Sequence, residues 1–443
     1  MSDERWRMLM TPDRVGVDEP GAITPQRSPF QRDFDRVAFS GSFRRLQDKT
    51  QVFPLVKTDY VRTRLTHSLE TSSVGRSLGS AVGVFVCDNF DMGGVTPSDV
   101  GAVVAAACLA HDIGNPPLGH AGEEAIRHWF AHSAAAKPFH DMFDAAEYSD
   151  IARYEGNAQG FRVLTKLEMP DRRGGMQLTC ATLGALAKYP GSSQSNFSKF
   201  SFFMAEKPLF SEVAEHCGLL RTTPEQWTRH PLSHLVEAAD DITYLIVDFE
   251  DGLRLGMIHP NELERLFLEL LDSPAARREL ETVKTSRRRA EFLRARVIGE
   301  LVRQTAAAFI DRHDEILNGK LAAPLLSFIP AAGILDRIRR RSEESIYSNR
   351  RVAEVVAAGF EMVSGMLDIF VPCVGELAEE HSGGRPASSR SRRLGALLPE
   401  GAFADPKTME DPYLRLLGVL DYISAMTDGY AVDLYQKLKG ISL

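Results

Sequence analysis

Apolar residues recur with helical spacing along most of this chain. The expected helices cover residues 100–110, 232–251, 262–271, 291–310 and 352–370, each with Leu, Ala, Ile or Val gathered on one face. Thr96 or Ser98 can cap the first of them, and Gly114 and Pro116 follow its end. Segments that alternate like strands are few, and residues 50–56 are the best candidate. The pattern therefore predicts an all-α fold.

The same pattern divides the chain into three expected regions. Residues 1–30 look loosely structured, residues 31–260 form a helical core, and residues 261–443 form a C-terminal helical subdomain. Within the last region, residues 381–393 (HSGGRPASSRSRR) offer almost nothing to bury and predict a mobile surface loop.

Composition narrows the class of protein. A net charge of -8 over 443 residues does not indicate a general nucleic-acid binder. The five cysteines are scattered without a C-x-x-C pair, which favours a reducing compartment over a disulfide frame or a zinc knuckle. The N-terminus lacks the apolar core of a secretory signal, and apolar stretches such as residues 100–110 are too short to cross a bilayer. We expect a soluble cytoplasmic protein that does not contact a membrane.

An ionisable pair, His111 and Asp112, ends the apolar helix at residues 100–110. Imidazole and carboxylate together suit a divalent metal such as Mn²⁺, Fe²⁺, Co²⁺ or Zn²⁺, and also admit Mg²⁺. The alternative is structural, with Asp112 as a cap and His111 as a hydrogen-bonded core residue. The pair alone does not decide between the two.

Two further helices carry side chains that could complete a metal and phosphate site with His111 and Asp112. His67 follows Arg64 by three residues, so a metal ligand and a phosphate-binding guanidinium share one helix face. Asp240, Tyr244 and Asp248 form a polar stripe on the otherwise apolar helix at 232–251. Such a stripe is costly to bury without a ligand or metal. Spacing alone leaves Asp240 and Asp241 as equal candidates for the acidic ligand.

These sequence segments together resemble those of the HD-domain metallophosphohydrolases. The resemblance is closer still to the bacterial deoxyguanosine triphosphate triphosphohydrolases (dGTPases) and their broader-specificity dNTPase relatives. It extends from about residue 27 to about residue 435. The matching phrases are RRLQDKTQVFP (44–54), RTRLTHSLE (62–70), HDIGNPPLGH (111–120), YEGNAQGFR (154–162), EAADDITY (237–244) and DYISAMTD (421–428).

The resemblance implies roles for particular residues and an HD-domain helical fold. It selects Asp240 over Asp241 and matches His67, His111, Asp112 and Asp240 to the metal ligands. It matches His120 and Glu123 to a catalytic pair. The substrate-binding positions that it implies are Gln47, Arg64, Asn157, Lys199, Tyr244 and Asp248. The family usually has glycine where Ser201 stands, two residues after Lys199.

The implied activity is metal-dependent hydrolysis of dGTP or several dNTPs to deoxynucleoside and intact triphosphate. The cofactor would be Mn²⁺, Mg²⁺ or another transition metal. Family members are often homo-oligomers, hexamers among them, with dNTP or single-stranded DNA as effector. The alternatives are a nucleotide or single-stranded DNA sensor with an HD fold, or an HD phosphodiesterase acting on another nucleotide. Basic clusters at residues 287–296 and 337–341 suit a sensor, although a solvated helix face interspersed with Glu is the favoured explanation for them.

Overall fold

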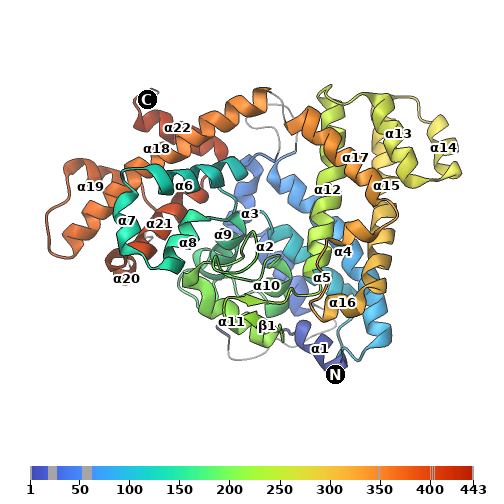
Figure 1. The fold of residues 1–443 in the computed structure, drawn as a ribbon, viewed down its shortest axis with the longest axis horizontal. Helices are drawn as coiled ribbons and strands as arrows, with labels where there is room; N and C mark the ends of the chain where they lie inside the picture. The colour runs from blue at the N-terminus through green and yellow to red at the C-terminus, as the bar shows by residue number, and fades with distance from the viewer. Residues whose placement is uncertain are drawn as a thin grey trace.

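The computed structural model describes residues 2–17, 27–51, 62–347, 350–399, 401, 403 and 405–441. Over these residues the chain is mainly helical, and the strands are limited to an antiparallel pair, β1 (Arg221–Thr223) and β2 (Gln226–Trp227) (Figure 1). The predicted all-α class is confirmed. Of the expected strand at 50–56, Thr50 forms one isolated bridge with Thr63, and residues 52–56 lie outside the described residues.

Three long helices form the centre of the molecule. They are α4 (Arg64–Asn89), α5 (Pro97–Ala110) and α12 (Ser233–Arg254), and α4 packs against both of the others. Thr96 caps α5 in a capping box with Asp99, as the sequence allowed. The nearly all-apolar α5 is buried because it lies between its neighbours.

Smaller elements of the first half surround this centre. The N-terminal ones are α1 (Ser2–Leu9), α2 (Pro29–Ala38), α3 (Gly41–Arg45) and η1 (Leu46–Asp48). The later ones are α9 (Gly156–Arg162), η2 (Val163–Leu167), α10 (Cys180–Leu186), η3 (Met204–Glu206) and α11 (Lys207–His216). Residues 2–17 differ from the expected loose structure, because the fully buried Trp6 donates to Nε2 of His313 at 3.1 Å and anchors α1.

The first part of the C-terminal region packs on the same core. Its elements are α13 (Pro260–Leu271), α14 (Pro274–Glu281), α15 (Ser286–Asp311), α16 (His313–Leu317), η4 (Leu325–Phe328), α17 (Ala332–Ser342) and η5 (Glu343–Tyr347). They lie beside α12 and α4 on the right of Figure 1, and their apolar residues join the cluster of the central helices. The apolar residues of 260–347 are therefore continuous with the core of the central helices.

A second core lies on the left of Figure 1. It is built by α6 (His120–His132), α7 (Lys137–Met142), α8 (Ala145–Ala152), α18 (Arg350–His381), α19 (Ser389–Gly395), α20 (Pro406–Glu410), α21 (Pro412–Ser424) and α22 (Asp428–Leu438). The expected C-terminal subdomain therefore divides between two cores, and its second half packs on helices from residues 120–152. The reason is that α6 packs along α18, where Nε1 of Trp129 donates to Oδ1 of Asp368 at 2.7 Å.

Two details of this second core differ from expectation. Residues 389–393 of the expected mobile loop at 381–393 belong to α19, because Ser388 caps the helix and Leu394 is buried. Among the described helices, α18 is also long and apolar enough to cross a membrane by length and composition alone. Its buried residues, such as Met366 and Phe370, pack within the second core.

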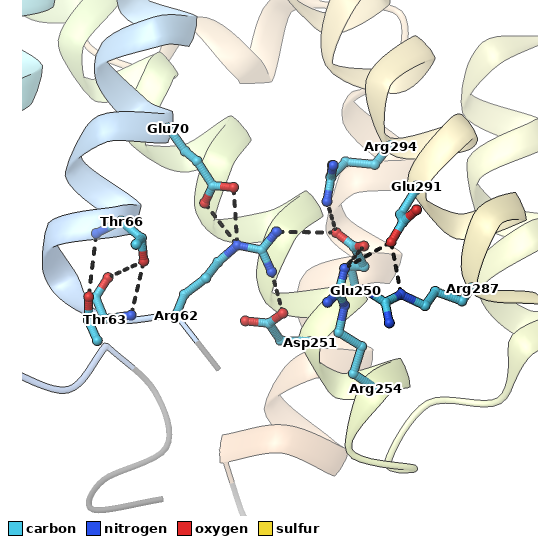
Figure 2. A network of polar contacts seen from close by, with 10 residues as sticks. All are labelled: Arg62, Thr63, Thr66, Glu70, Glu250, Asp251, Arg254, Arg287, Glu291 and Arg294. Carbon is cyan, nitrogen blue, oxygen red and sulfur yellow. Dashed lines mark hydrogen bonds and ion pairs between the residues drawn. The ribbon is translucent and has the colours of Figure 1, made fainter. Parts of the chain in front are cut away.

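The basic clusters are paired with acids across helices. Arg294 of α15 lies 2.5 Å from Glu250 of α12, and Arg341 of α17 lies 2.9 Å from Glu262 of α13. Figure 2 shows the larger network, in which Arg62 contacts Glu70, Glu250 and Asp251 just before the start of α4. These pairs favour a charge-balanced helix face over a nucleic-acid surface. The ion pairs of Arg62 also fix the start of α4 against α12.

Candidate metal centre and catalytic cavity

Three predicted metal ligands converge from three helices. His67 lies on the second turn of α4, His111 follows the last residue of α5, and Asp240 lies in the middle of α12. The Oδ1 atom of Asp240 is 3.1 Å from Nε2 of His67 and 3.4 Å from Nε2 of His111. One ligand atom from each residue lies within 4.8 Å of the others. Asp112 adjoins this group, with Oδ1 3.5 Å from Nε2 of His111.

The histidine geometry fits a metal. Nδ1 of His111 lies 2.7 Å from the carbonyl oxygen of Cys108, which can only accept a hydrogen bond. Nδ1 therefore carries a proton, and Nε2 faces the carboxylates, where it would offer its lone pair to a bound metal as metal-ligating histidines do. Two imidazole nitrogens and two carboxylates suit a borderline divalent ion. The donor set thus agrees with the metal expected from the sequence.

The acids of this centre are held ionised. Burial acts to raise the pKa of Asp112, but the charges of Arg64, His111 and His67 hold it well below its usual range. The Arg64 guanidinium lies 2.8 Å from Oδ2 of Asp112. Burial likewise opposes the low pKa of Asp240, which Lys188 and His111 impose. Anionic oxygens are therefore available to a cation.

The predicted catalytic pair lies on α6, next to this centre. Nδ1 of His120 is 2.9 Å from Oε2 of Glu123, and Oε1 of Glu123 accepts a hydrogen bond from the Gly156 amide at 2.7 Å. The His120 side chain is 73% exposed, whereas that of Glu123 is 3% exposed. Burial raises the pKa of Glu123, but the hydrogen bond and charge of His120 outweigh burial, so the net shift is downward. The pair is thus an accessible imidazole held by a buried carboxylate.

Gly119 is required by the turn that leads into α6. Its φ of +59° is one that residues with side chains rarely adopt, and an added Cβ would lie 2.2 Å from an amino nitrogen of Arg64. The positive φ therefore favours glycine at this position, and a side chain there would displace the Arg64 guanidinium.

These groups line one cavity with a volume of about 510 Å³. Arg64, Asn157, Lys199 and Tyr244, all predicted to bind substrate, are among its lining residues, together with His111, Asp112, His120, Glu123 and Asp240. Among the described lining residues, the predicted metal ligand His67 and two of the residues predicted to bind substrate are missing. Gln47 is exposed on η1, and Asp248 is buried two turns beyond Asp240 on α12.

Lys188 is a site residue that the sequence argument did not identify. It lies two residues after α10, its Nζ is 2.6 Å from Oδ2 of Asp240, and it lines the cavity. Burial acts to lower the pKa of Lys188, yet the charge and hydrogen bond of Asp240 raise it. The sequence gives little indication of a role for Lys188, because Lys188-Tyr189-Pro190 belongs to no periodic pattern. Its position directly after an apolar helix is the one feature that could have marked it as a candidate.

Comparison with known proteins gives one consistent result. A family model described as the HD domain matches residues 64–168. A deoxyguanosinetriphosphate triphosphohydrolase-like protein of Synechocystis is 40% identical, over 99% of this chain and 100% of its own. One from Pseudomonas aeruginosa is also 40% identical, over 99% of both chains. The deoxyguanosinetriphosphate triphosphohydrolase of Klebsiella pneumoniae is 29% identical, over 93% of this chain and 94% of its own.

Proposed function

Because this chain belongs to the deoxyguanosinetriphosphate triphosphohydrolase-like family of HD-domain metal-dependent phosphohydrolases, we propose that it hydrolyses deoxynucleoside triphosphates to deoxynucleoside and intact triphosphate. One observation carries the proposal. The converging atoms of His67, His111 and Asp240 adjoin a cavity that three cationic side chains also line. A polyanion held against a divalent metal requires this combination of charges.

The cationic side chains are proposed to bind the triphosphate. Arg64 offers a planar pair of donors beside Asp112, and Lys188 and Lys199 add two ammonium groups in the same cavity. Charges fixed at several points along the phosphate chain would orient the α-phosphorus for in-line attack. When bound, a divalent ion supplies Lewis-acid stabilisation of the negative charge that develops on the α-phosphate.

His120 is proposed to move the proton of the reaction. Its ring is accessible from the cavity, and Glu123 fixes the ring through Nδ1, which leaves Nε2 free to take or give a proton. Attack of water at the α-phosphorus expels the 5′-oxygen of the nucleoside, so the three phosphates leave as one piece. The proposal includes a homo-oligomer, a hexamer among the expected forms, and a dNTP or single-stranded DNA effector.

Product analysis tests this proposal. Metal-free protein is incubated with each dNTP and either Mn²⁺ or Mg²⁺ in H₂¹⁸O, and the products are separated by chromatography. We expect deoxynucleoside and intact triphosphate, with the ¹⁸O label in the triphosphate, because water attacks phosphorus. Deoxynucleoside mono- or diphosphate as product would contradict the proposed function, and label in the deoxynucleoside would contradict attack at phosphorus.

Tyr244 is proposed to select deoxy substrates. It lines the cavity one helical turn after Asp240, where a ring packed beneath the sugar leaves little space for a 2′-hydroxyl. We expect Tyr244→Ala to reduce the ratio of kcat/KM for dGTP over GTP by about 10-fold or more, within the range that pocket contacts supply. Tyr244→Phe keeps the ring and is the matched control. Comparable turnover of dGTP and GTP by the unmodified protein would refute this role.

A further inference from the structure

The segment at residues 421–428 (DYISAMTD) has no part in the chemistry proposed above, yet it contacts residues that line the cavity. Asp428, the first residue of α22, is 2% exposed. Its Oδ2 atom accepts a hydrogen bond from the Thr50 amide at 2.8 Å, and its Oδ1 atom accepts one from the Leu118 amide at 2.9 Å. Thr50 and Leu118 both line the cavity. One buried carboxylate therefore joins two loops of the cavity that are far apart in the sequence.

Lys49 joins the same loops a second time. Its Nζ donates to the carbonyl oxygens of Asn115 at 2.6 Å and Ser424 at 2.7 Å. The carbonyl oxygen of Lys49 accepts from the Arg64 amide at 3.0 Å, at the start of α4. Burial lowers the pKa of Lys49 to about 7, against the opposing charge of Asp428. The loop at 49–50, the turn at 115–118 and the end of α21 are thus one connected unit.

The turn held by this unit has an unfavourable backbone. Leu118 has a φ of +63°, a left-handed conformation that leucine rarely adopts, and Gly119 with φ +59° follows it. Contacts from the C-terminal helices impose this conformation. The Leu118 amide is bound by Asp428, and its side chain lies so close to Gly359 of α18 that an added Cβ there would be 1.9 Å from Leu118 Cδ1. Such a conformation persists only where the surroundings enforce it.

His120 begins α6 directly after this turn. We propose that Asp428 is a positioning residue for His120, acting through the Leu118 amide and the turn at residues 118–119. This inference rests on the proposed function, since it assigns His120 a role in turnover. Loss of the Asp428 carboxylate frees the Leu118 amide, lets the turn relax and moves His120 relative to the metal centre. The ligands His67, His111 and Asp240 keep their own contacts.

The variants are Asp428→Ala and Asp428→Asn, and the control is Asp433→Asn, which alters an exposed acid on the same helix. We expect Asp428→Ala to lower kcat on the order of 10²-fold, as a small displacement of a catalytic group does. Mn²⁺ affinity, measured by calorimetry, stays unchanged. Asp428→Asn keeps one acceptor oxygen, so we expect its kcat to lie between those of Asp428→Ala and the unmodified protein. This variant provides the test if Asp428→Ala does not fold.

A double variant separates positioning from a merely structural role. If Asp428 acts through His120, then His120→Ala combined with an Asp428 substitution is no slower than His120→Ala alone. Additive losses, or an unchanged kcat in both Asp428 variants, would overturn the inference.

Hydrogen exchange keeps this test independent of the substrate. The peptide that spans residues 113–123 should exchange faster in the Asp428 variants than in Asp433→Asn, whichever nucleotide the enzyme cleaves. Equal exchange refutes the inference. Absence of dNTP turnover in the unmodified protein, with the exchange difference present, refutes the proposed function instead and leaves Asp428 as the residue that holds the turn.

Discussion

His111→Ala is expected to abolish dNTP hydrolysis and to release the metal. The substitution removes one of two imidazole nitrogens that face Asp240, and it leaves the buried Asp112 and the partly exposed Asp240 without that partner. Loss of a direct ligand should exceed the roughly 10–100-fold effect of losing an outer hydrogen-bond partner of a metal site. Turnover assays with added Mn²⁺, together with metal content by mass spectrometry, measure both effects.

The control for this experiment is His381→Ala, which removes an exposed histidine at the end of α18. Its turnover and metal content should match those of the unmodified protein. The same pair of variants separates the two classes of function left open by the sequence. A nucleotide or DNA sensor that does not use the metal would keep its binding response in His111→Ala. Unchanged hydrolysis in His111→Ala would contradict the proposed metal centre.

His120→Ala is expected to lower kcat by roughly 10²–10⁴-fold, the usual contribution of a positioned acid or base. Metal affinity should not change, because His120 is not among the converging ligand atoms. The role of its proton is tested with a substrate that carries a 4-nitrophenyl leaving group, which needs no proton donor. A much smaller loss with that substrate indicates a general acid, and an equal loss indicates a general base.

Glu123→Gln tests how His120 is held. The amide keeps an acceptor for the Gly156 amide but loses the charge that faces His120. Because the net pKa of Glu123 is lowered, its carboxylate stays ionised until the pH falls below the ordinary glutamate range. The unmodified enzyme should therefore lose the charge-dependent part of its activity only in acid, whereas Glu123→Gln lacks it at every pH. A kcat for Glu123→Gln equal to that of the unmodified enzyme would contradict the pairing.

Several helices could be predicted because their signals are local. Apolar periodicity located α5, α12, α13, α15 and α18. Ionisable residues at or within apolar helices pointed to His111 and to Asp240 or Asp241, and only the family resemblance favoured Asp240. Lys188 was missed because its importance comes from a 2.6 Å contact with a residue 52 positions away. No local pattern records such a contact.

The division of the C-terminal region could not be predicted for a related reason. Amphipathic helices show that a face will be buried, but they do not show which partner buries it. The apolar faces of α15 and α18 look alike in the sequence, yet α15 packs on α4 and α12 while α18 packs on α6. The prediction of a loop at 381–393 failed because it relied on the small number of apolar residues there. Three buried residues, Ala387, Ser391 and Leu394, hold α19 and the residues before it against the second core.

The second core has a consequence for synthesis of the protein. A nascent chain that has emerged from the ribosome as far as α17 already contains His67, His111, Asp112 and Asp240. It still lacks α18, which packs on α6, and α21, which packs on α18 and α7. The ligands can thus assemble before His120 has a stable support. Any activity that depends on His120 would therefore begin only once α18 and α21 have folded onto the rest of the chain.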